Sequence, residues 1–596
     1  MRAWAWPARL AVVAVIVAAL AVDQSLGAEP DTPPPAPTPA GVPTAAVSAE
    51  PVSSTWYCAV VRSASSEAAG GVAVDAQLVL ANRGTEDLAA TISYVAPTSE
   101  DVSRVVEVAA GSSVVVDPAD DIDAAQVAAL VEAPGGDLVV ERRLVNQDSE
   151  TCAAAPHGEW YLAGGDTSVD AVTSVVILNP FPSDAVVDLV FASEAEPGPF
   201  TVLDLEGFVV PARSVLQVDL TEAVRRRTDV ATALVARSGS VVVDRLVSFD
   251  GSEGRAGLSL ALGAPATATR WVWPGGRIDD ATQMQVHIFN PGDEGAEVDV
   301  APQFGSLTSG VVAVPAAVSV PAHDEVTIDV VPFGAEGGRP QRIEVTPGRP
   351  FGLVVESADG VPVVVDIEVA NRPSPTTTTT APPTTTTTAP PTTTPPTTTT
   401  TAPPASDTTG ADDEAAAGTS TTAAPTTAPP TTAATTATSA PGGAGSPGQP
   451  GRSTTTAAPP TTTATTTTTT TVVDPAIEAI PERRAEGGAD LTLAASRLGQ
   501  RWLVIAPRGQ NLVSRLVIHN PASAATEVRV DTIGPGGRTP LTEIEVEALA
   551  SVEVPLEPSL AGTLLVTEAS GPVAVGVVAE VDDGVGLRTQ LGWLLA

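Results

Sequence analysis

The stretch Val175–Phe191, VVILNPFPSDAVVDLVF, decides the fold. Two apolar runs flank an Asn-Pro dipeptide and a short polar patch. Proline fixes its own φ and lacks an N–H, so strand pairing has to stop there. The preceding asparagine is pushed towards extended geometry, and its side chain can bond to the backbone two residues further on. The pattern therefore predicts a strand, a corner and a second strand.

Three further copies of this phrase occur in the chain, as LVLANRGTEDLAATISYV from Leu78, VHIFNPGDEGAEVDV from Val286 and LVIHNPASAATEVRV from Leu516. A position that recurs in every repeat favours a structural corner over a ligand site. In the first copy, the backbone freedom of Gly84 replaces the proline. The expected corner residues are Asn82, Asn179, Pro180, Asn290, Pro291, Asn520 and Pro521. The alternative is that the four asparagines line one ligand surface.

A tryptophan opens each repeat, in STWYCAVV, GEWYLAGG, TRWVWPGG and QRWLVIAP. Aromatic residues make up only 3% of the chain, so one large ring per repeat is expected to fill a core. The expected core tryptophans are Trp56, Trp160, Trp271 and Trp502. The alternative is carbohydrate stacking on Trp271 and Trp273, which alternation would place on one face of a strand.

Each repeat is about 100 residues long, with short Val-rich strands broken by Gly, Pro, Asn and Asp, which is typical of a β-sandwich. We expect an all-β fold of tandem immunoglobulin-like β-sandwich modules, three plus one, separated by a disordered Thr/Pro-rich linker. The predicted modules are residues 55–148, 157–264, 268–372 and 488–596. Helical content is expected to be small, with Asp121–Ala133 and Thr221–Ala233 as the best candidates.

Three other segments are not expected to form modules. Residues 1–28 combine arginines with a short apolar run, which predicts a signal peptide, or an N-terminal anchor if it is not cleaved. Residues 29–54 are Pro/Ala-rich and are expected to be disordered. Residues 373–474 are Thr/Pro-rich and predict an extended spacer, either unmodified or O-glycosylated.

The charge and the cysteine content indicate an exported protein. The chain has 596 residues, a net charge of −40 and no lysine, so nucleic acid is an unsuitable partner and Lys–Asn isopeptide crosslinks cannot form. Membrane contact is expected only through the N-terminal segment, if it stays uncleaved. The two cysteines, Cys58 and Cys152, predict one disulfide and an oxidising compartment.

The sequence carries no recognised catalytic, cofactor or metal motif. The four histidines, His157, His287, His323 and His519, are scattered, so no catalytic residue, cofactor or metal ligand is expected. Calcium binding by the acidic loops at residues 117–123 and 292–295 is an alternative to plain solvation, although neither loop fits the EF-hand pattern.

STWYC near the start, the Asn-Pro corners and the closing strand VVVDRLV resemble a family of actinobacterial exported proteins, domain-of-unknown-function family 5719, over about residues 56–371. The resemblance implies export and an envelope setting, and no activity. We expect a cell-envelope structural or interaction protein that presents its modules on a Thr/Pro stalk, with a cell-wall polymer or surface protein as partner. The alternatives are a secreted carbohydrate- or ligand-binding protein using Trp271 and Trp273, or more remotely a hydrolase.

Overall fold

The computed structural model describes most of the chain outside the low-complexity segments. The described residues are 52–63, 74–97, 102–144, 148–252, 255–279, 282–305, 315–335, 339–371, 489–509, 511–581 and 587–595. The predicted signal peptide at 1–28 and the predicted spacer at 373–474 lie outside them. Of the predicted disordered residues 29–54, only 52–54 are described, and Ser53 and Ser54 belong to a strand, so the prediction is wrong there.

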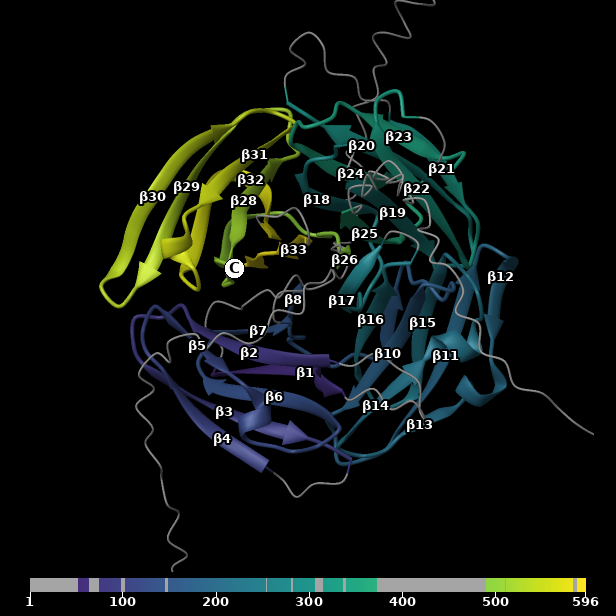
Figure 1. The fold of residues 1–596 in the computed structure, drawn as a ribbon, viewed down its shortest axis with the longest axis horizontal. Coiled ribbons are helices and arrows are strands. Elements are labelled where there is room, and N and C mark those ends of the chain that lie inside the picture. Colours follow the sequence, from purple (N-terminus) through teal and green to yellow (C-terminus); the bar gives the residue numbers. More distant parts are fainter. Residues whose placement is uncertain are drawn as a thin grey trace, which may run out of the picture. The chain divides into compact units, whose positions relative to one another are not determined.

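The prediction of an all-β protein built from sandwich modules is confirmed (Figure 1). Each module has two sheets. We call the sheet that contains the repeated tryptophan the Trp sheet, and the sheet that contains the strand before the corner asparagine the Asn sheet. Strand pairing is antiparallel throughout the described sheets, except between β22 and β23.

Modules 1 and 2 lie in the N-terminal half of the chain. Module 1 contains β1 (Ser53–Ser63), β2 (Val74–Asn82), β3 (Leu88–Val95), β4 (Val102–Val108), β5 (Ser112–Val116), η1 (Pro118–Asp120), β6 (Gln126–Pro134), β7 (Leu138–Leu144) and β8 (Asp148–Thr151). Module 2 contains β9 (Glu159–Leu162), β10 (Ala171–Asn179), β11 (Ala185–Ser193), β12 (Glu196–Thr201), η2 (Leu203–Leu205), β13 (Phe208–Val210), β14 (Ser214–Asp219), α2 (Leu220–Ala223), β15 (Val230–Ser238), β16 (Val242–Asp250) and β17 (Ala256–Leu262).

Modules 3 and 4 follow. Module 3 contains β18 (Arg270–Gly276), β19 (Thr282–Asn290), β20 (Ala296–Gln303), β21 (Ala316–Val320), β22 (Asp324–Pro332), β23 (Arg342–Val345), β24 (Phe351–Ser357), β25 (Val364–Asn371) and β26 (Ala489–Leu493). Module 4 contains β27 (Gly499–Ile505), β28 (Leu512–Asn520), β29 (Thr526–Gly534), β30 (Gly537–Val546), β31 (Ala550–Leu556), η3 (Pro558–Leu560), β32 (Leu564–Val581), β33 (Leu587–Leu591) and β34 (Trp593–Leu594).

The strand order repeats from module to module. The four Asn sheets are β5-β2-β7-β8, β14-β10-β16-β17, β23-β22-β19-β25-β26 and β31-β28-β32-β33. The four Trp sheets are β4-β3-β6-β1, β12-β11-β15-β9, β21-β20-β24-β18 and β30-β29-β32-β27-β34. In module 4, the long strand β32 contributes to both sheets.

The helix prediction at Asp121–Ala133 is wrong, and the one at Thr221–Ala233 holds only for its first three residues. Most of Asp121–Ala133 lies in strand β6, and Thr221–Ala233 contains the end of the one-turn helix α2 and the start of β15. Runs such as VAALVEA also alternate between inward and outward positions, and pairing with β1 and β3 decides for a strand. Among the described residues, no helix has the length and apolarity to cross a bilayer.

Strand β26 changes the predicted boundary at residue 488. It pairs with β25 of module 3, from Ala370↔Ala489 to Asp366↔Leu493, although the predicted fourth module includes it. Ala495 bridges Val272 in the first strand of module 3, just as Ala264 bridges Tyr161 in module 2 and Ala153 bridges Tyr57 in module 1. The physical reason is that β25 would otherwise be an unpaired edge strand. In modules 1 and 2, the equivalent strands β7 and β16 are paired in the same way with β8 and β17.

The Thr/Pro-rich segment is therefore an insertion between two neighbouring strands of one sheet. The corresponding connections in modules 1, 2 and 4 are residues 145–147, 251–255 and 582–586, against 372–488 in module 3. The last strands of the four modules also contact one another in a closed order, β8 to β17, β17 to β26, β26 to β33 and β33 to β8. This differs from the expectation of a distal fourth module on a stalk.

Each predicted core tryptophan joins the two sheets of its own module. The rings of Trp56, Trp160, Trp271 and Trp502 are at most 3% exposed. Each indole Nε1 donates to a backbone carbonyl at or near the start of a strand segment in the Asn sheet, at 2.8–3.0 Å. The acceptors are the carbonyls of Leu138, Val241, Val363 and Val573. The ring fills the aliphatic core and its one polar atom is satisfied, which is what a buried tryptophan requires.

Each corner asparagine makes the same set of bonds in its own module. Asn179 donates through Nδ2 to the carbonyls of Ser183, Val210 and Pro211, and its Oδ1 accepts from the N–H of Phe181. Corresponding bonds surround Asn82, Asn290 and Asn520, and all four side chains are fully buried. The four asparagines lie at four separate corners and line no common surface.

We expect Asn179→Ala to lower the free energy of unfolding by about 2–4 kcal/mol, because several buried carbonyls lose their donor. Pro180→Ala is the matched control, since it changes only backbone freedom and should cost about 1 kcal/mol or less. Urea unfolding of the two variants measures the difference. Equal losses in the two variants would contradict the role given to the asparagine side chain.

The predicted disulfide joins Cys58 in β1 to Cys152, which follows β8. It closes a loop of 94 residues and contributes on the order of 4–5 kcal/mol in the chain-entropy model. In modules 2 and 4, the positions equivalent to the two cysteines hold one large side chain, Leu162 or Val504, packed against one glycine, Gly263 or Gly592. A Cβ added to Gly263 would lie 3.0 Å from Leu162, and one added to Gly592 would lie 2.9 Å from Val504.

Candidate functional site: the polar seams between modules

The modules meet at four seams, which we call the 1/2, 2/3, 3/4 and 4/1 seams. At the 1/2 seam, the guanidinium of Arg142 makes a two-pronged contact with the carboxylate of Asp244, and both side chains are completely buried. Burial raises the pKa of Asp244, although the charge of Arg142 opposes the shift. The two residues depend on each other, because either partner alone would be an uncompensated buried charge.

The 2/3 seam repeats this pair with the next two modules. Arg245 of module 2 lies 2.9 Å from Asp366 of module 3, and both are nearly inaccessible. The same guanidinium donates to the carbonyls of Ala163 and Gly164. Each of these two arginines is paired across the sheet with the strand residue four positions before a corner asparagine. Arg142 and Arg245 are therefore equivalent residues of the repeat.

The other two seams lack this pair, and the equivalent positions show why. In module 3 the arginine position is Ile367, and in module 4 it is Val577. The acidic position is Glu141 in module 1 and Gly576 in module 4. At the 3/4 seam, neither an arginine nor an acid is therefore available at these positions, and no ion pair forms there.

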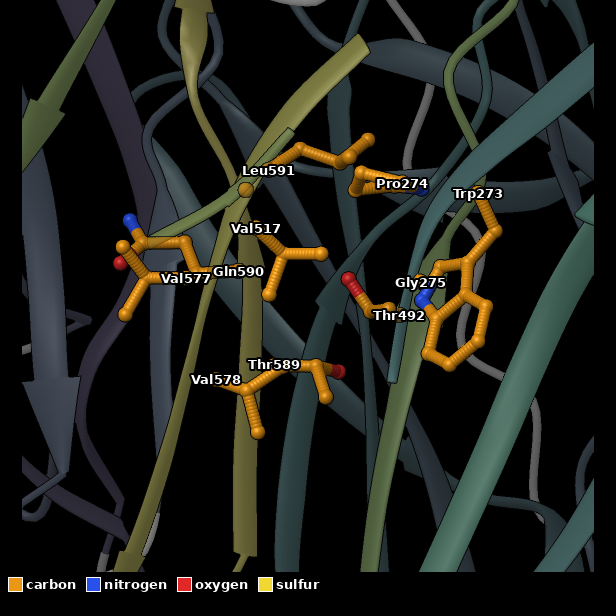
Figure 2. Close-up of a pocket in the computed structure, with 11 residues that line it drawn as sticks. Trp273, Pro274, Gly275, Thr492, Val517, Val577, Val578, Thr589, Gln590 and Leu591 are labelled. Atoms are coloured by element: carbon orange, nitrogen blue, oxygen red, sulfur yellow. The ribbon is translucent and has the colours of Figure 1, made fainter. Parts of the chain in front are cut away.

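A small cavity marks the missing pair at the 3/4 seam (Figure 2). Its lining includes Trp273 and Thr492 of module 3, and Gly576, Thr589 and Gln590 of module 4. The cavity has room for roughly one water molecule, whose centre can move within about 10 Å³. Pockets for small ligands are about 300–1,000 Å³, so this cavity is far too small for a sugar ring.

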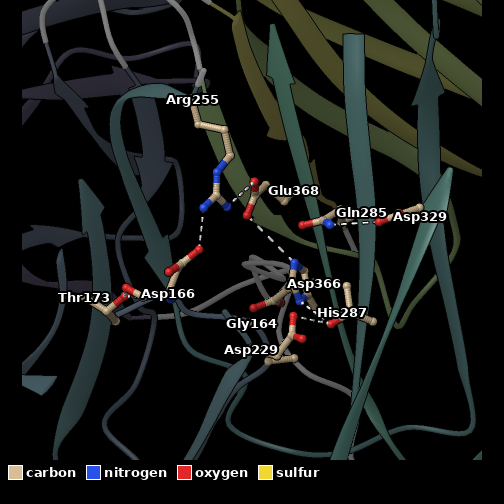
Figure 3. Close-up of polar contacts among 12 residues, drawn as sticks. Gly164, Asp166, Thr173, Asp229, Arg255, Gln285, His287, Asp329, Asp366 and Glu368 are labelled. Carbon is tan, nitrogen blue, oxygen red and sulfur yellow. Dashed lines mark hydrogen bonds and ion pairs between the residues drawn. The ribbon is translucent and has the colours of Figure 1, made fainter. Parts of the chain in front are cut away.

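His287 lies at the centre of a larger network at the 2/3 seam (Figure 3). Its ring is 2% exposed, and Nδ1 lies 3.1 Å from Glu325 Oε1 and 3.1 Å from Thr327 Oγ1. Nε2 lies 3.9 Å from Glu368. Glu325 Oε1 also accepts the backbone N–H of Gly164 in module 2, at 2.7 Å, so this histidine–glutamate pair contacts both modules.

Two further arginines connect the network across the seam. Arg255 of module 2 contacts Asp166 of its own module at 2.5 Å and Glu368 of module 3 at 3.4 Å. Arg339 of module 3 contacts Asp229 of module 2 at 2.6 Å. Burial lowers the pKa of both arginines, but the surrounding carboxylates outweigh it and the net shift is upward.

Carboxylates outnumber cations in this network. The acidic groups are Asp166, Asp170, Asp229, Glu325, Asp329, Asp366 and Glu368, and the arginines are Arg245, Arg255 and Arg339. In the part of the chain that the structure describes, no three His, Cys, Asp or Glu side chains are placed to hold a metal ion. His287 is the histidine of this network, and a proton on its ring would reduce the excess negative charge by one.

The residues predicted as candidates for ligand binding have structural contacts. Trp271 and Trp273 are 0% and 4% exposed, so neither offers a face for stacking a sugar, and that alternative is not supported. In the acidic loops, Asp117 caps η1, Asp121 binds Tyr94 and Arg104, and Asp293 pairs with His323. These three carboxylates are used by neighbouring side chains and backbone.

The seam residues were missed by the sequence reasoning, although one signal was available. The closing strands carry an acid followed by arginine at Glu141-Arg142 and Asp244-Arg245, and an acid alone at Asp366. Its recurrence in successive modules could have predicted an ion pair between the arginine of one module and the acid of the next. The boundary at β26 also had a signal, because Ala153, Ala264 and Ala495 each precede a core tryptophan by seven residues.

Comparison with known proteins gives a family and no activity. The model of the family described as "Family of unknown function (DUF5719)" matches residues 148–446. The predicted family is thus confirmed, but the match begins at β8 instead of residue 56 and ends beyond residue 371. No curated protein matches the sequence. A tetra-tandem repeat in the extending region of a large adhesion protein has 10% identity, over 87% of this chain and 95% of that chain, at a TM-score of 0.09.

Proposed function

Because the chain belongs to the DUF5719 family of unknown function, we propose its role from its own architecture: an exported, non-catalytic envelope scaffold that displays the Thr/Pro-rich segment from a closed β body. One observation carries the proposal. The segment begins after Asn371 and ends before Ala489, and these ends belong to two paired strands, β25 and β26. The body therefore holds both ends of the segment at one place.

Further observations support the export part of the proposal. The run Leu10–Val22 has the length of a signal-peptide core, and the Cys58–Cys152 disulfide suits an oxidising compartment. The lysine-free, Ala- and Thr-rich composition fits an actinobacterial source. The composition of residues 373–474 is typical of O-glycosylated segments, which makes threonine glycosylation part of the proposal.

The scaffold role follows from where the polar groups are used. The buried charges lie at seams and join modules, and the cavity at the 3/4 seam holds no more than about one water. The partner is a cell-wall polymer or surface protein reached by the displayed segment. With a net charge of −40, the chain disfavours nucleic acid and other polyanions.

A loop replacement tests this role directly. Residues 372–488 are replaced by the equivalent connection of module 2, residues 251–255, and both proteins are incubated with isolated cell envelopes. We expect the short variant to keep its melting temperature within a few degrees, because the paired strands are unchanged, and to lose most envelope retention. Undiminished retention of a folded short variant would overturn the display role. Intact-mass analysis of native protein reports signal cleavage and glycan load.

A further inference from the structure

We propose that the 2/3 seam is a proton-responsive joint, tightened when His287 is protonated and loosened when it loses that proton. The inference stands independently of the display role, because it concerns the body alone. It starts from the geometry of the network, in which a fully buried histidine lies between two carboxylates of module 3, one of which accepts a backbone N–H of module 2. No second histidine lies in this network within the described residues.

The groups that face His287 come from every element packed around it. Glu325 and Asp329 lie on β22, and Asp366 and Glu368 lie on β25. Module 2 supplies Asp229, just before β15, which accepts from Thr327 Oγ1 at 2.8 Å. The cations nearby are Arg245, Arg255 and Arg339, each already paired with at least one carboxylate.

Protonated His287 supplies the positive charge that the network lacks. With imidazolium in place, Nδ1–H donates to Glu325 and Nε2–H faces Glu368. Glu325 in turn accepts the N–H of Gly164, so the proton indirectly stabilises a contact between modules. Without it, Glu325 and Glu368 remain as like charges in a site from which water is excluded.

The direction of the pH effect can be worked out group by group. Burial lowers the pKa of His287, but the hydrogen bond to Glu325 and the charges of Glu325, Glu368 and Asp229 outweigh it and raise the pKa. A raised histidine pKa gives stability that is complete below about pH 6.5 and is lost as pH rises through the folded value. Burial also raises the pKa of Glu325 and of Asp366, against the pull of His287 and Arg245, so these groups act in the same direction.

The test compares two buried histidines in the full-length protein. His519 in module 4 is equally buried, but burial lowers its pKa to about 3, so it stays neutral at every pH used. Hydrogen exchange of the Gly164 amide is followed from pH 7 to 9, after correction for the intrinsic exchange rate, in wild type, His287→Gln and His519→Gln. The titration of Glu150 at the 1/2 seam, whose pKa burial raises to about 7, overlaps the lower end of this window, but it is common to all three proteins and cancels in the comparison.

In wild type and in His519→Gln, we expect the opening constant at Gly164 to rise with pH, by up to about tenfold per pH unit while His287 titrates. His287→Gln should open more readily at pH 7 and show a flat profile. Selective 13C labelling of the four histidines reports the titration of His287 directly. A pH-independent opening constant in wild type, or an unchanged slope in His287→Gln, would overturn the proposal.

Discussion

Replacing Arg142 by methionine is expected to lower the free energy of unfolding by about 3–5 kcal/mol, more than the loss expected for Asn179→Ala. The cause is the fate of Asp244, which is completely buried and would keep its charge without a partner, or take up a proton at a cost. Chemical unfolding of the purified protein at neutral pH measures the loss.

The double variant Arg142→Met/Asp244→Leu is the control for this substitution. With both charges removed, an apolar pair of similar volume fills the seam, and most of the lost stability should return. If the double variant is as unstable as the single one, shape and not charge holds the 1/2 seam. The 1/2 seam is the simpler place for this test, because Arg142 there donates to Asp244 and to the carbonyls of Val60 and Thr151, whereas the corresponding Arg245 belongs to the larger network of the 2/3 seam.

Cleavage within residues 373–474 is expected to give two pieces on a denaturing gel and one particle on a native column. The C-terminal piece carries β26, which pairs with β25 of the N-terminal piece, and the apolar residues of module 4 pack against module 1. The Cys58–Cys152 disulfide lies within the N-terminal piece, so the association would be non-covalent.

A protease site placed near the middle of the Thr/Pro-rich segment makes the cut at a defined position. The uncut protein is the control for size, and the cut protein in denaturant is the control for complete cleavage. Two separate peaks under native conditions would contradict the closed arrangement and would favour a distal fourth module on a stalk.

The parts of the fold that depend on local chemistry could be predicted from the sequence. An Asn-Pro corner needs only the proline ring and the asparagine amide, and Asn179 and Asn520 lie in the same kind of turn. A single large ring among aliphatic residues has few places to go other than a core. The strands around these residues follow from alternation, which the helix predictions at Asp121–Ala133 and Thr221–Ala233 overlooked.

The parts that depend on contacts between distant residues could not be predicted in this way. Pairing of β25 with β26 joins residues separated by more than a hundred positions, and composition suggested a boundary where the sheet continues. The Arg142–Asp244 pair and the His287 network depend on which faces of two modules meet. Until the modules are placed side by side, each acid and arginine looks like a surface charge.

The connection between β25 and β26 also shows how much foreign sequence such a hairpin accepts. The chain carries a long low-complexity segment there, and the strand that completes the sheet is still paired. The equivalent hairpins, at residues 145–147, 251–255 and 582–586, join the same pairs of strands. They offer three ready sites for grafting cargo such as enzymes, epitopes or fluorescent reporters, all emerging from the same edge position of the repeat.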